Sequence, residues 1–449
     1  MVSRSPVVMP RLLTIVLILL SAPVLGYAVA AYGNVQRLLS VISFIACLPL
    51  ILALGSIEWL IWISLISNVL IECWFIPSSV LFFLRFIPMG LLACYGIAAS
   101  SVNQVKLTAT PKFLLYPMAL MGVLALLSTL YAVDPSNTFQ RSLALIFAIL
   151  SFGISIPLFI SEQGRRRQSA QRFMMVCLVS VMLSMVAYVA HVPQAISEER
   201  LSGIYSNANT LGVVAMFVLV MLIGWFLDAT TRNSRIAFGL AFVVTLSATL
   251  LSGSRASLLG ALAGFMVFLA FSRSRARLRG VWVLIIVLGL ALTFLPIPEV
   301  HIFSADTSLR DLTWKAAFDL GMRSPVLGTG FSTDKITADN TQIISGIRIR
   351  AGHNEYLRTF IGLGATGLVV LLVTLVVLVL KAIQTIRRAS GTDAIWMQSL
   401  LAAVVAGMVN AVFEDGLLAF GGVAALLFWY LAFTLAIEIQ THSLRLGRA

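Results

Sequence analysis

One histidine and two arginines have the side-chain types and positions in this sequence that could do chemistry. His353 stands where a polar segment meets an apolar run, and Asn354 and Glu355 follow it directly. Because a neutral imidazole takes up a proton near neutral pH, His353 can serve as a general base. Arg255 lies between two apolar runs, and Arg200 follows two glutamates and precedes Leu201-Ser202-Gly203. An arginine kept near the hydrocarbon usually faces a cavity or a binding partner. These residues predict a site for an anionic substrate.

Each of these residues also has a structural interpretation. An arginine at the end of a membrane helix can extend to lipid phosphates, which applies to Arg200, Arg255 and Arg141. A single histidine is more often structural than catalytic. Arg348 and Arg350 alternate in a short segment and could be solvated loop charges. The residue types alone leave these alternatives open.

The composition indicates whether the chain folds in water or in a lipid bilayer. Of 449 residues, 59% are hydrophobic and 11% are charged, whereas soluble domains carry about 25% charged residues. A chain of soluble domains is therefore excluded, and a membrane protein is predicted. The four cysteines lie in or at the ends of apolar runs without C-x-x-C spacing, so a zinc site or a disulfide framework is not expected.

Apolar runs long enough to cross about 30 Å of hydrocarbon recur along the chain. They predict an all-α polytopic membrane protein with fourteen spans, or twelve if the short second and third runs form one re-entrant or merged element. The first apolar run, 12–31, is longer than the roughly 7–15 residues of the apolar region of a cleaved signal peptide, so we expect it to be retained. The predicted spans are 12–31, 38–54, 59–74, 80–99, 113–132, 143–161, 173–190, 209–227, 236–252, 256–271, 281–296, 359–383, 395–413 and 417–437.

The net charge of +13 would suggest a polyanionic partner in a soluble protein. With the N-terminus inside, however, most of the 31 basic residues fall in inner segments and account for nearly all of the net charge. Such a bias orients a membrane protein. We therefore expect both termini in the cytoplasm, no nucleic-acid partner, and an outer location for His353, Arg200 and Arg255.

One outer connection is long, from 297 to 352, and a loop of this length is usually functional. It divides the chain into helices 1–296, a loop segment 297–358 and C-terminal helices with a tail, 359–449. Apolar residues at helical spacing predict an amphipathic helix over 311–322 at the membrane surface. Ser324-Pro325 ends this helix, and a turn follows at 328–330.

Four ordered segments resemble the landmarks of the O-antigen ligase and O-antigen polymerase superfamily. The resemblance extends over roughly residues 130 to 415, and the landmarks share one order and one membrane side. The segments are Arg200-Leu-Ser-Gly-Ile-Tyr205-Ser-Asn-Ala-Asn209, Ser252-Gly-Ser-Arg255, Trp314 through Ser324-Pro-Val-Leu-Gly-Thr-Gly330, and His353-Asn354-Glu-Tyr-Leu leading into Gly362-Leu-Gly-Ala-Thr-Gly.

The resemblance implies metal-independent glycosyl transfer at the outer face of the bacterial inner membrane, with a glycan on undecaprenyl diphosphate as donor. It also implies an architecture like that of other lipid-linked glycosyltransferases of the GT-C type. In this chain Arg200 and Arg255 would hold the diphosphate and His353 would be the base, with a supporting role for Asp415. The further candidate substrate-binding residues are Arg141, Tyr205, Asn209, Arg348, Arg350 and Asn354.

The chemistry of these residues agrees with that implication. A diphosphate leaving group needs its developing charge stabilised, and guanidinium groups can do this without a metal ion or another cofactor. The resemblance, with this chemistry beside it, implies an inverting O-antigen ligase with lipid A-core as acceptor.

Three alternatives stay open. A polymerase of the same superfamily would use the same residues on a lipid-linked acceptor. A transporter of lipid-linked glycans would also need polytopic helices with buried arginines, although no internal repeat is evident. The carboxylate pairs Glu198-Glu199 and Glu414-Asp415 could ligate a cation, but neighbours on a helix do not share a face, so neither pair alone predicts such a site.

Overall fold

A computed structural model describes the backbone of residues 57–70, 72–75, 88–97, 110–159, 163–271, 308–331, 343–344, 347–348 and 353–446. The predicted spans 12–31, 38–54 and 281–296 lie outside these residues, as does Arg350. Arg348 is described by its backbone alone.

The described part of the chain is helical, apart from two short antiparallel hairpins, β1 (Ile196–Ser197) with β2 (Arg200–Leu201) and β3 (Ile343–Ile344) with β4 (Ile347–Arg348). An unlabelled helix spans Pro88–Ile97. The labelled helices are α3 (Ile57–Leu70), α5 (Lys112–Leu127), η2 (Ser128–Leu130), α6 (Pro135–Leu150), η3 (Ser151–Ser155), α7 (Ile156–Phe159), α8 (Gln163–Val189), η4 (Pro193–Ala195), α9 (Ala208–Asp228), α10 (Arg232–Leu251), α11 (Arg255–Phe271), α13 (Ser308–Gly321), α15 (Glu355–Arg388), α16 (Gly391–Asn410) and α17 (Val423–Leu446).

Eight helical segments of the described chain are long and apolar enough to cross a membrane, and three further apolar helices are shorter. Exposed apolar side chains recur at helical spacing on the outside of the bundle. On α15 they are Val369, Leu372, Val373, Val376 and Leu380. A face of this kind needs a lipid solvent. The predicted all-α, multi-pass membrane protein is confirmed.

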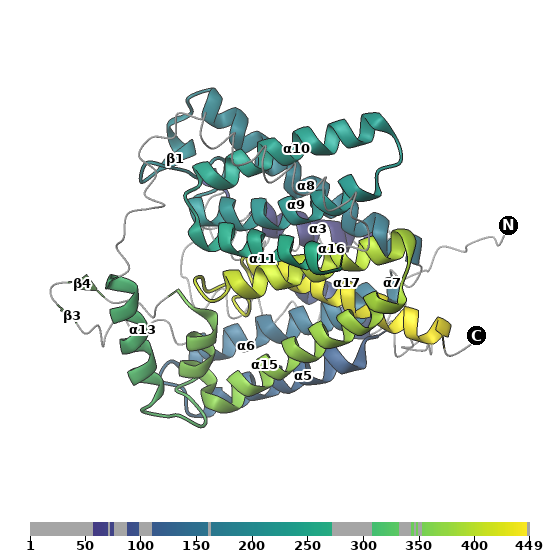
Figure 1. The fold of residues 1–449 in the computed structure, drawn as a ribbon. Helices are drawn as coiled ribbons and strands as arrows, with labels where there is room; N and C mark the ends of the chain where they lie inside the picture. The colour runs from purple at the N-terminus through teal and green to yellow at the C-terminus, as the bar shows by residue number, and fades with distance from the viewer. Residues whose placement is uncertain are drawn as a thin grey trace, which may run out of the picture.

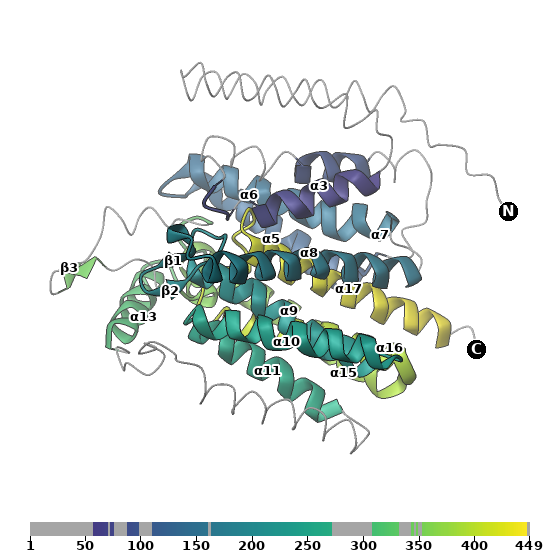
Figure 2. The same ribbon diagram turned by 90° about the horizontal axis from the view of Figure 1, so that it is seen from above.

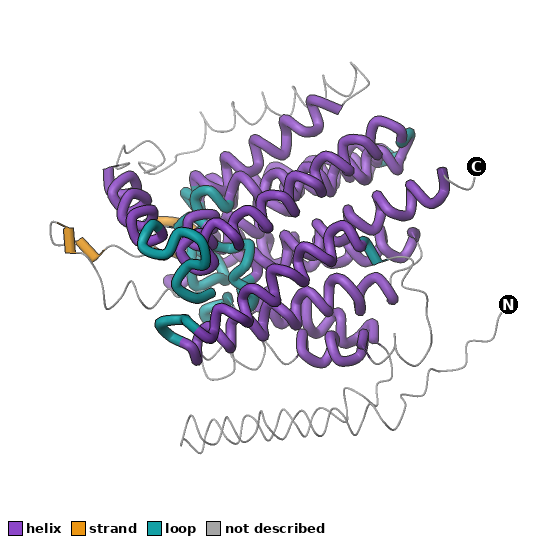
Figure 3. Tube along the Cα trace, turned by 90° about the horizontal axis from the view of Figure 1, so that it is seen from below, coloured by secondary structure: helices purple, strands orange, loops and turns teal. Residues whose placement is uncertain are grey.

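The helices lie side by side in one bundle (Figures 1 and 2). α9 and α17 are the most buried of the candidate spans, and α9 packs against α10, α11 and α16. α13 and both hairpins lie at one end of the bundle (Figure 1), where the larger described loops also gather (Figure 3). We call this the loop end.

Some predicted boundaries are wrong for identifiable reasons. α6 begins at Pro135 instead of 143, because Asp134 accepts a hydrogen bond from the Asn137 amide and caps a helix whose first turns are polar. α17 begins at Val423 instead of 417, because 411–422 folds as a loop. The third predicted run ends at Leu70 and the fourth includes only Pro88–Ile97 as a described helix.

The predicted span 359–383 is part of α15, which is broken at Gly364. This residue has φ 63° and ψ −166°, which are not helical angles, so a short helix before it is separated from the long span after it. A positive φ is accessible to glycine at no steric cost. The short piece, 355–363, begins two residues after His353, with Asn354 as its N-cap.

The opposite end of the bundle is held by buried charges. The Arg166 guanidinium of α8 lies 3.1 Å from the Glu438 carboxylate of α17, and both side chains are almost fully buried. Trp396 of α16 donates its indole N–H to the same carboxylate at 3.4 Å. Arg166 belongs to the basic segment that was predicted to mark the inner side by charge alone, so one of these arginines also joins three helices.

Candidate active site

A two-residue hairpin turn presents Arg200 at the loop end. Ser197 pairs with Arg200, and the intervening Glu198 and Glu199 have φ of 52° and 61°. Two positive φ angles are the requirement of a tight turn that matches the twist of its strands. Glu198 and Glu199 therefore serve as turn residues that place the arginine.

Arg200 connects this hairpin to two other segments. Its Nε donates a hydrogen bond to the Ser252 carbonyl at 2.8 Å, and its guanidinium also donates to the Asn209 side-chain oxygen. Ser252 lies in the turn between α10 and α11, and Arg255 begins α11 three residues later. Arg200 is therefore hydrogen-bonded to the turn that leads into Arg255, the other arginine predicted to hold an anion.

Asn209 extends this arrangement toward the C-terminal helices. It lies in the first turn of α9, and its amide nitrogen donates to Oε1 of Glu414 at 2.9 Å. Its oxygen accepts from Arg200 and its nitrogen donates to Glu414, so both ends of this amide are engaged.

His353 is held by the residues that follow it. Asn354 caps α15 by accepting hydrogen bonds from the amides of Tyr356 and Leu357, both at 3.0 Å. The Glu355 amide donates to the Ala411 carbonyl, and its buried carboxylate accepts from the Leu417 amide at 3.0 Å. These bonds tie the start of α15 to both ends of the 411–417 segment.

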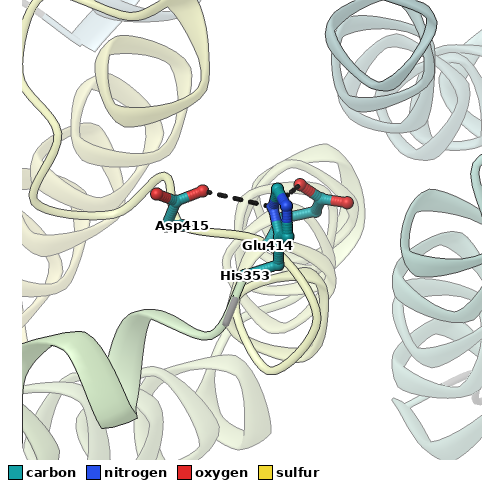
Figure 4. A group of neighbouring side chains, drawn as sticks. All are labelled: His353, Glu414 and Asp415. Carbon is teal, nitrogen blue, oxygen red and sulfur yellow. Dashed lines mark ion pairs between the residues drawn. The ribbon is translucent and has the colours of Figure 1, made fainter. Parts of the chain in front are cut away.

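That segment carries the two carboxylates that face the imidazole. His353 Nδ1 lies 3.6 Å from Glu414 Oε2 and 3.8 Å from Asp415 Oδ1, and Figure 4 shows the ring between the two acids. Arg358, one turn into α15, lies 3.4 Å from the other oxygen of Asp415. The His353 side chain is 60% exposed and Glu414 only 15%, so a substrate can reach the imidazole while Glu414 stays behind it.

Glu414 and Asp415 were not expected to form a cation site as a pair alone, and in the structure they approach a third group, His353. They lie in a bend instead of a helix, so both can turn toward one histidine. Together with His353 they offer ligand atoms within 4.8 Å of one another, a set of one imidazole and two carboxylates that could hold a metal ion. The sequence analysis assigned the supporting role to Asp415 and considered Glu414 only as a member of a possible cation-binding pair, although an acidic pair ending an apolar run before Gly416 indicates a polar turn.

The segment 314–330, which includes most of α13 and the loop after it, packs beside the break in α15. α13 confirms the amphipathic helix predicted over 311–322, and its Phe318 stacks on Phe360 with ring centres 5.9 Å apart. The following segment bonds to α15 through its backbone: Thr329 N–H donates to the Ile361 carbonyl and Gly330 N–H to the Gly362 carbonyl, both at 2.9 Å. These two glycine-rich sequences therefore form one contact that fixes the short helix after His353.

The other candidate residues have different surroundings. Tyr205 is fully buried and its hydroxyl lies 2.7 Å from Ser180 Oγ, and burial raises the pKa of this phenol well above its ordinary value. This places Tyr205 beneath the hairpin loop as a packing residue. Asn354 uses its side-chain oxygen as a helix cap. Arg141 lies on α6 and Arg348 on β4, and a substrate role for either stays a prediction.

Residues 240–372 match the family model described as O-antigen ligase. The matched range contains Arg255, the α13 segment and His353, and it supports the O-antigen ligase and polymerase superfamily that the four landmarks resemble. This family implies a membrane enzyme that acts on lipid-linked glycans. Comparison with curated proteins gave no match.

Proposed function

We propose that this protein is an O-antigen ligase of the bacterial inner membrane. It transfers a glycan from undecaprenyl diphosphate to lipid A-core at the periplasmic face, by a metal-independent reaction that inverts the anomeric centre. The observation that carries the proposal is the continuous path from Arg200 through Asn209 and Glu414 to His353, because it joins a group suited to a diphosphate with a group suited to a hydroxyl.

The proposed reaction is a single displacement. His353 takes the proton of the acceptor hydroxyl, the acceptor oxygen bonds to the anomeric carbon, and the bond from that carbon to the diphosphate oxygen breaks. Since Nδ1 faces the carboxylates, we assign Nε2 on the other side of the ring to the acceptor. Arg200 and Arg255 stabilise the charge that develops on the departing diphosphate.

The orientation in the membrane supports a periplasmic site. The basic Arg232, Arg235, Arg387 and Arg388 lie at helix ends opposite the loop end. Since basic residues mark the cytoplasmic side, the loop end that carries His353 faces the periplasm.

The test compares His353→Asn with His191→Asn in purified protein reconstituted with lipid-linked donor and lipid A-core. Both histidines have positive φ, 31° and 53°, a conformation that asparagine tolerates, and His191 is exposed at the loop end. We expect His353→Asn to lower transfer by roughly 100-fold or more and His191→Asn to leave it within about twofold. Transfer at the wild-type rate by His353→Asn would contradict the assignment.

The products separate the other activities. A ligase consumes lipid A-core and releases free undecaprenyl diphosphate, with an inverted anomeric configuration in the product. A polymerase lengthens lipid-linked glycan with donor alone, and a transporter moves intact donor across the vesicle without cleaving it. A retained configuration would exclude the single displacement.

A further inference from the structure

The Glu414 carboxylate stands between the donor side and the acceptor side of the site. Its Oε1 accepts a hydrogen bond from Asn209 at 2.9 Å, and its Oε2 lies 3.6 Å from His353 Nδ1. The side chain is 15% exposed, so it is mostly removed from solvent and is held in place by α9. It acts on His353 from a fixed position.

The neighbouring Asp415 differs in two ways. Its side chain is 37% exposed, and the Arg358 guanidinium lies 3.4 Å from it. A cation at that distance compensates much of the carboxylate charge. The described hydrogen-bond partner of Glu414 is instead the neutral amide of Asn209. Of the two acids, Glu414 therefore has the charge that is directed most fully at the imidazole.

Asn209 connects Glu414 to the donor side. The Asn209 side-chain amide accepts a hydrogen bond from Arg200 with its oxygen and donates one to Glu414 with its nitrogen. Because the amide group is planar, its orientation determines the direction of both hydrogen bonds. Hydrogen bonds in such a chain polarise one another. These two bonds form a direct hydrogen-bonded route from Arg200 to the carboxylate that faces His353.

We propose that Glu414 is the positioning residue of His353 and that it couples donor binding at Arg200 to proton uptake by the base. This inference rests on the proposed glycosyl transfer. The Glu414 carboxylate faces Nδ1 of the ring at 3.6 Å, which leaves Nε2 for the acceptor, and its charge stabilises the imidazolium that forms when the acceptor proton is taken. Asp415 has a lesser role at the exposed edge.

The experiment compares Glu414→Gln with Asp415→Asn, two isosteric changes that each remove one charge. Glu414 and Asp415 both face His353, and Arg358 lies behind Asp415. Loss of the Glu414 charge disfavours the imidazolium, so the acidic limb of the pH–rate profile moves to lower pH. We expect kcat to fall by roughly 100-fold with KM for the donor within about threefold. Asp415→Asn is expected to lower kcat less than tenfold and to leave the limb in place.

Two further variants keep the inference testable. Glu414→Asp keeps the charge, so it lowers kcat without moving the acidic limb. Asn209→Ser removes the amide between Arg200 and Glu414, and it lowers kcat more than Asp415→Asn does. Equal effects of Glu414→Gln and Asp415→Asn would overturn the inference; if Glu414→Gln does not fold, an effect of Asn209→Ser no larger than that of Asp415→Asn would do the same. Absence of transfer by the wild-type protein would instead contradict the proposed function.

Discussion

The backbone of Gly364 in α15 touches the backbone of Val326 in the segment after α13. A Cβ atom built on Gly364 would lie 2.3 Å from the carbonyl carbon and oxygen of Val326. The Ala365 amide donates to the Pro325 carbonyl at 2.7 Å in the same contact. The short helix that follows His353 is therefore braced from the outside by the segment that precedes it in the chain, and the position of the base depends on this contact.

Gly364→Ala is expected to destabilise the loop end and to reduce transfer together. Gly391 provides the control, because its φ of 59° is close to the 63° of Gly364 while nothing lies within 4 Å of its Cβ position. Gly391→Ala meets only the backbone cost of a positive φ, about 1–2 kcal/mol. Gly364→Ala adds a collision with backbone atoms, so its melting temperature in detergent should fall well below that of Gly391→Ala. Equal melting temperatures would show that the contact is not tight.

The sequence predicts the spans better than it predicts the site. Long apolar runs are local signals, and α5, α9, α10 and α11 lie close to their predicted ranges. The break at Gly364 was missed, because a glycine inside an apolar run does not reveal whether another backbone approaches it. The late start assigned to α6 has a similar cause, since its polar first turns read as loop.

The site depends on pairings that no local pattern contains. Asn209 and Glu414 are separated by 205 positions in the chain. The sequence around either residue does not indicate the other as its hydrogen-bond partner. His353, Arg200 and Arg255 were identified because charged groups beside apolar runs are unusual. Asn209 and the supporting role of Asp415 entered through the resemblance alone. Glu414 was considered only as a member of a possible cation-binding pair, because its partner Asn209 is distant in sequence.

Arg200→Lys is expected to weaken donor use although it keeps the positive charge. The planar guanidinium contacts both the Ser252 carbonyl and Asn209, and a single ammonium cannot reproduce both directions. Losing one hydrogen bond to a charged group costs about 1.5–3 kcal/mol, which corresponds to a decrease of roughly 10- to 100-fold in kcat/KM for the donor. Arg323, exposed at the end of α13, is the control, and Arg323→Lys should leave kcat/KM unchanged. A wild-type value for Arg200→Lys would remove Arg200 from the donor site.

Glu438→Gln is expected to destabilise the whole bundle without affecting the site. Arg166 is fully buried, so neutralising Glu438 breaks a buried ion pair, at a cost of about 3–5 kcal/mol. Asp228→Asn is the control, because the Arg167–Asp228 pair is partly exposed and such pairs contribute about 1 kcal/mol or less. In detergent, the melting temperature of Glu438→Gln should be lower than that of Asp228→Asn, and both should be lower than that of the wild-type protein. Transfer per folded molecule should stay at the wild-type level, and a selective loss of transfer would show that the two ends of the bundle are coupled.

Chelation of divalent cations is expected to leave transfer unchanged. The set formed by His353, Glu414 and Asp415 could hold a metal ion, since its ligand atoms lie within 4.8 Å of one another. The contacts of the two acids argue for a different use, because Glu414 is hydrogen-bonded to Asn209 and Asp415 is paired with Arg358. A cation at this set would compete with both contacts and would occupy Nδ1, the nitrogen that the proposed mechanism needs for orientation. Purified protein dialysed against a strong chelator, with its metal content measured, should transfer glycan at the untreated rate. A loss of transfer that returns on addition of Mg²⁺, Mn²⁺ or Zn²⁺ would assign these residues to a metal centre and would replace the histidine base with metal-assisted chemistry.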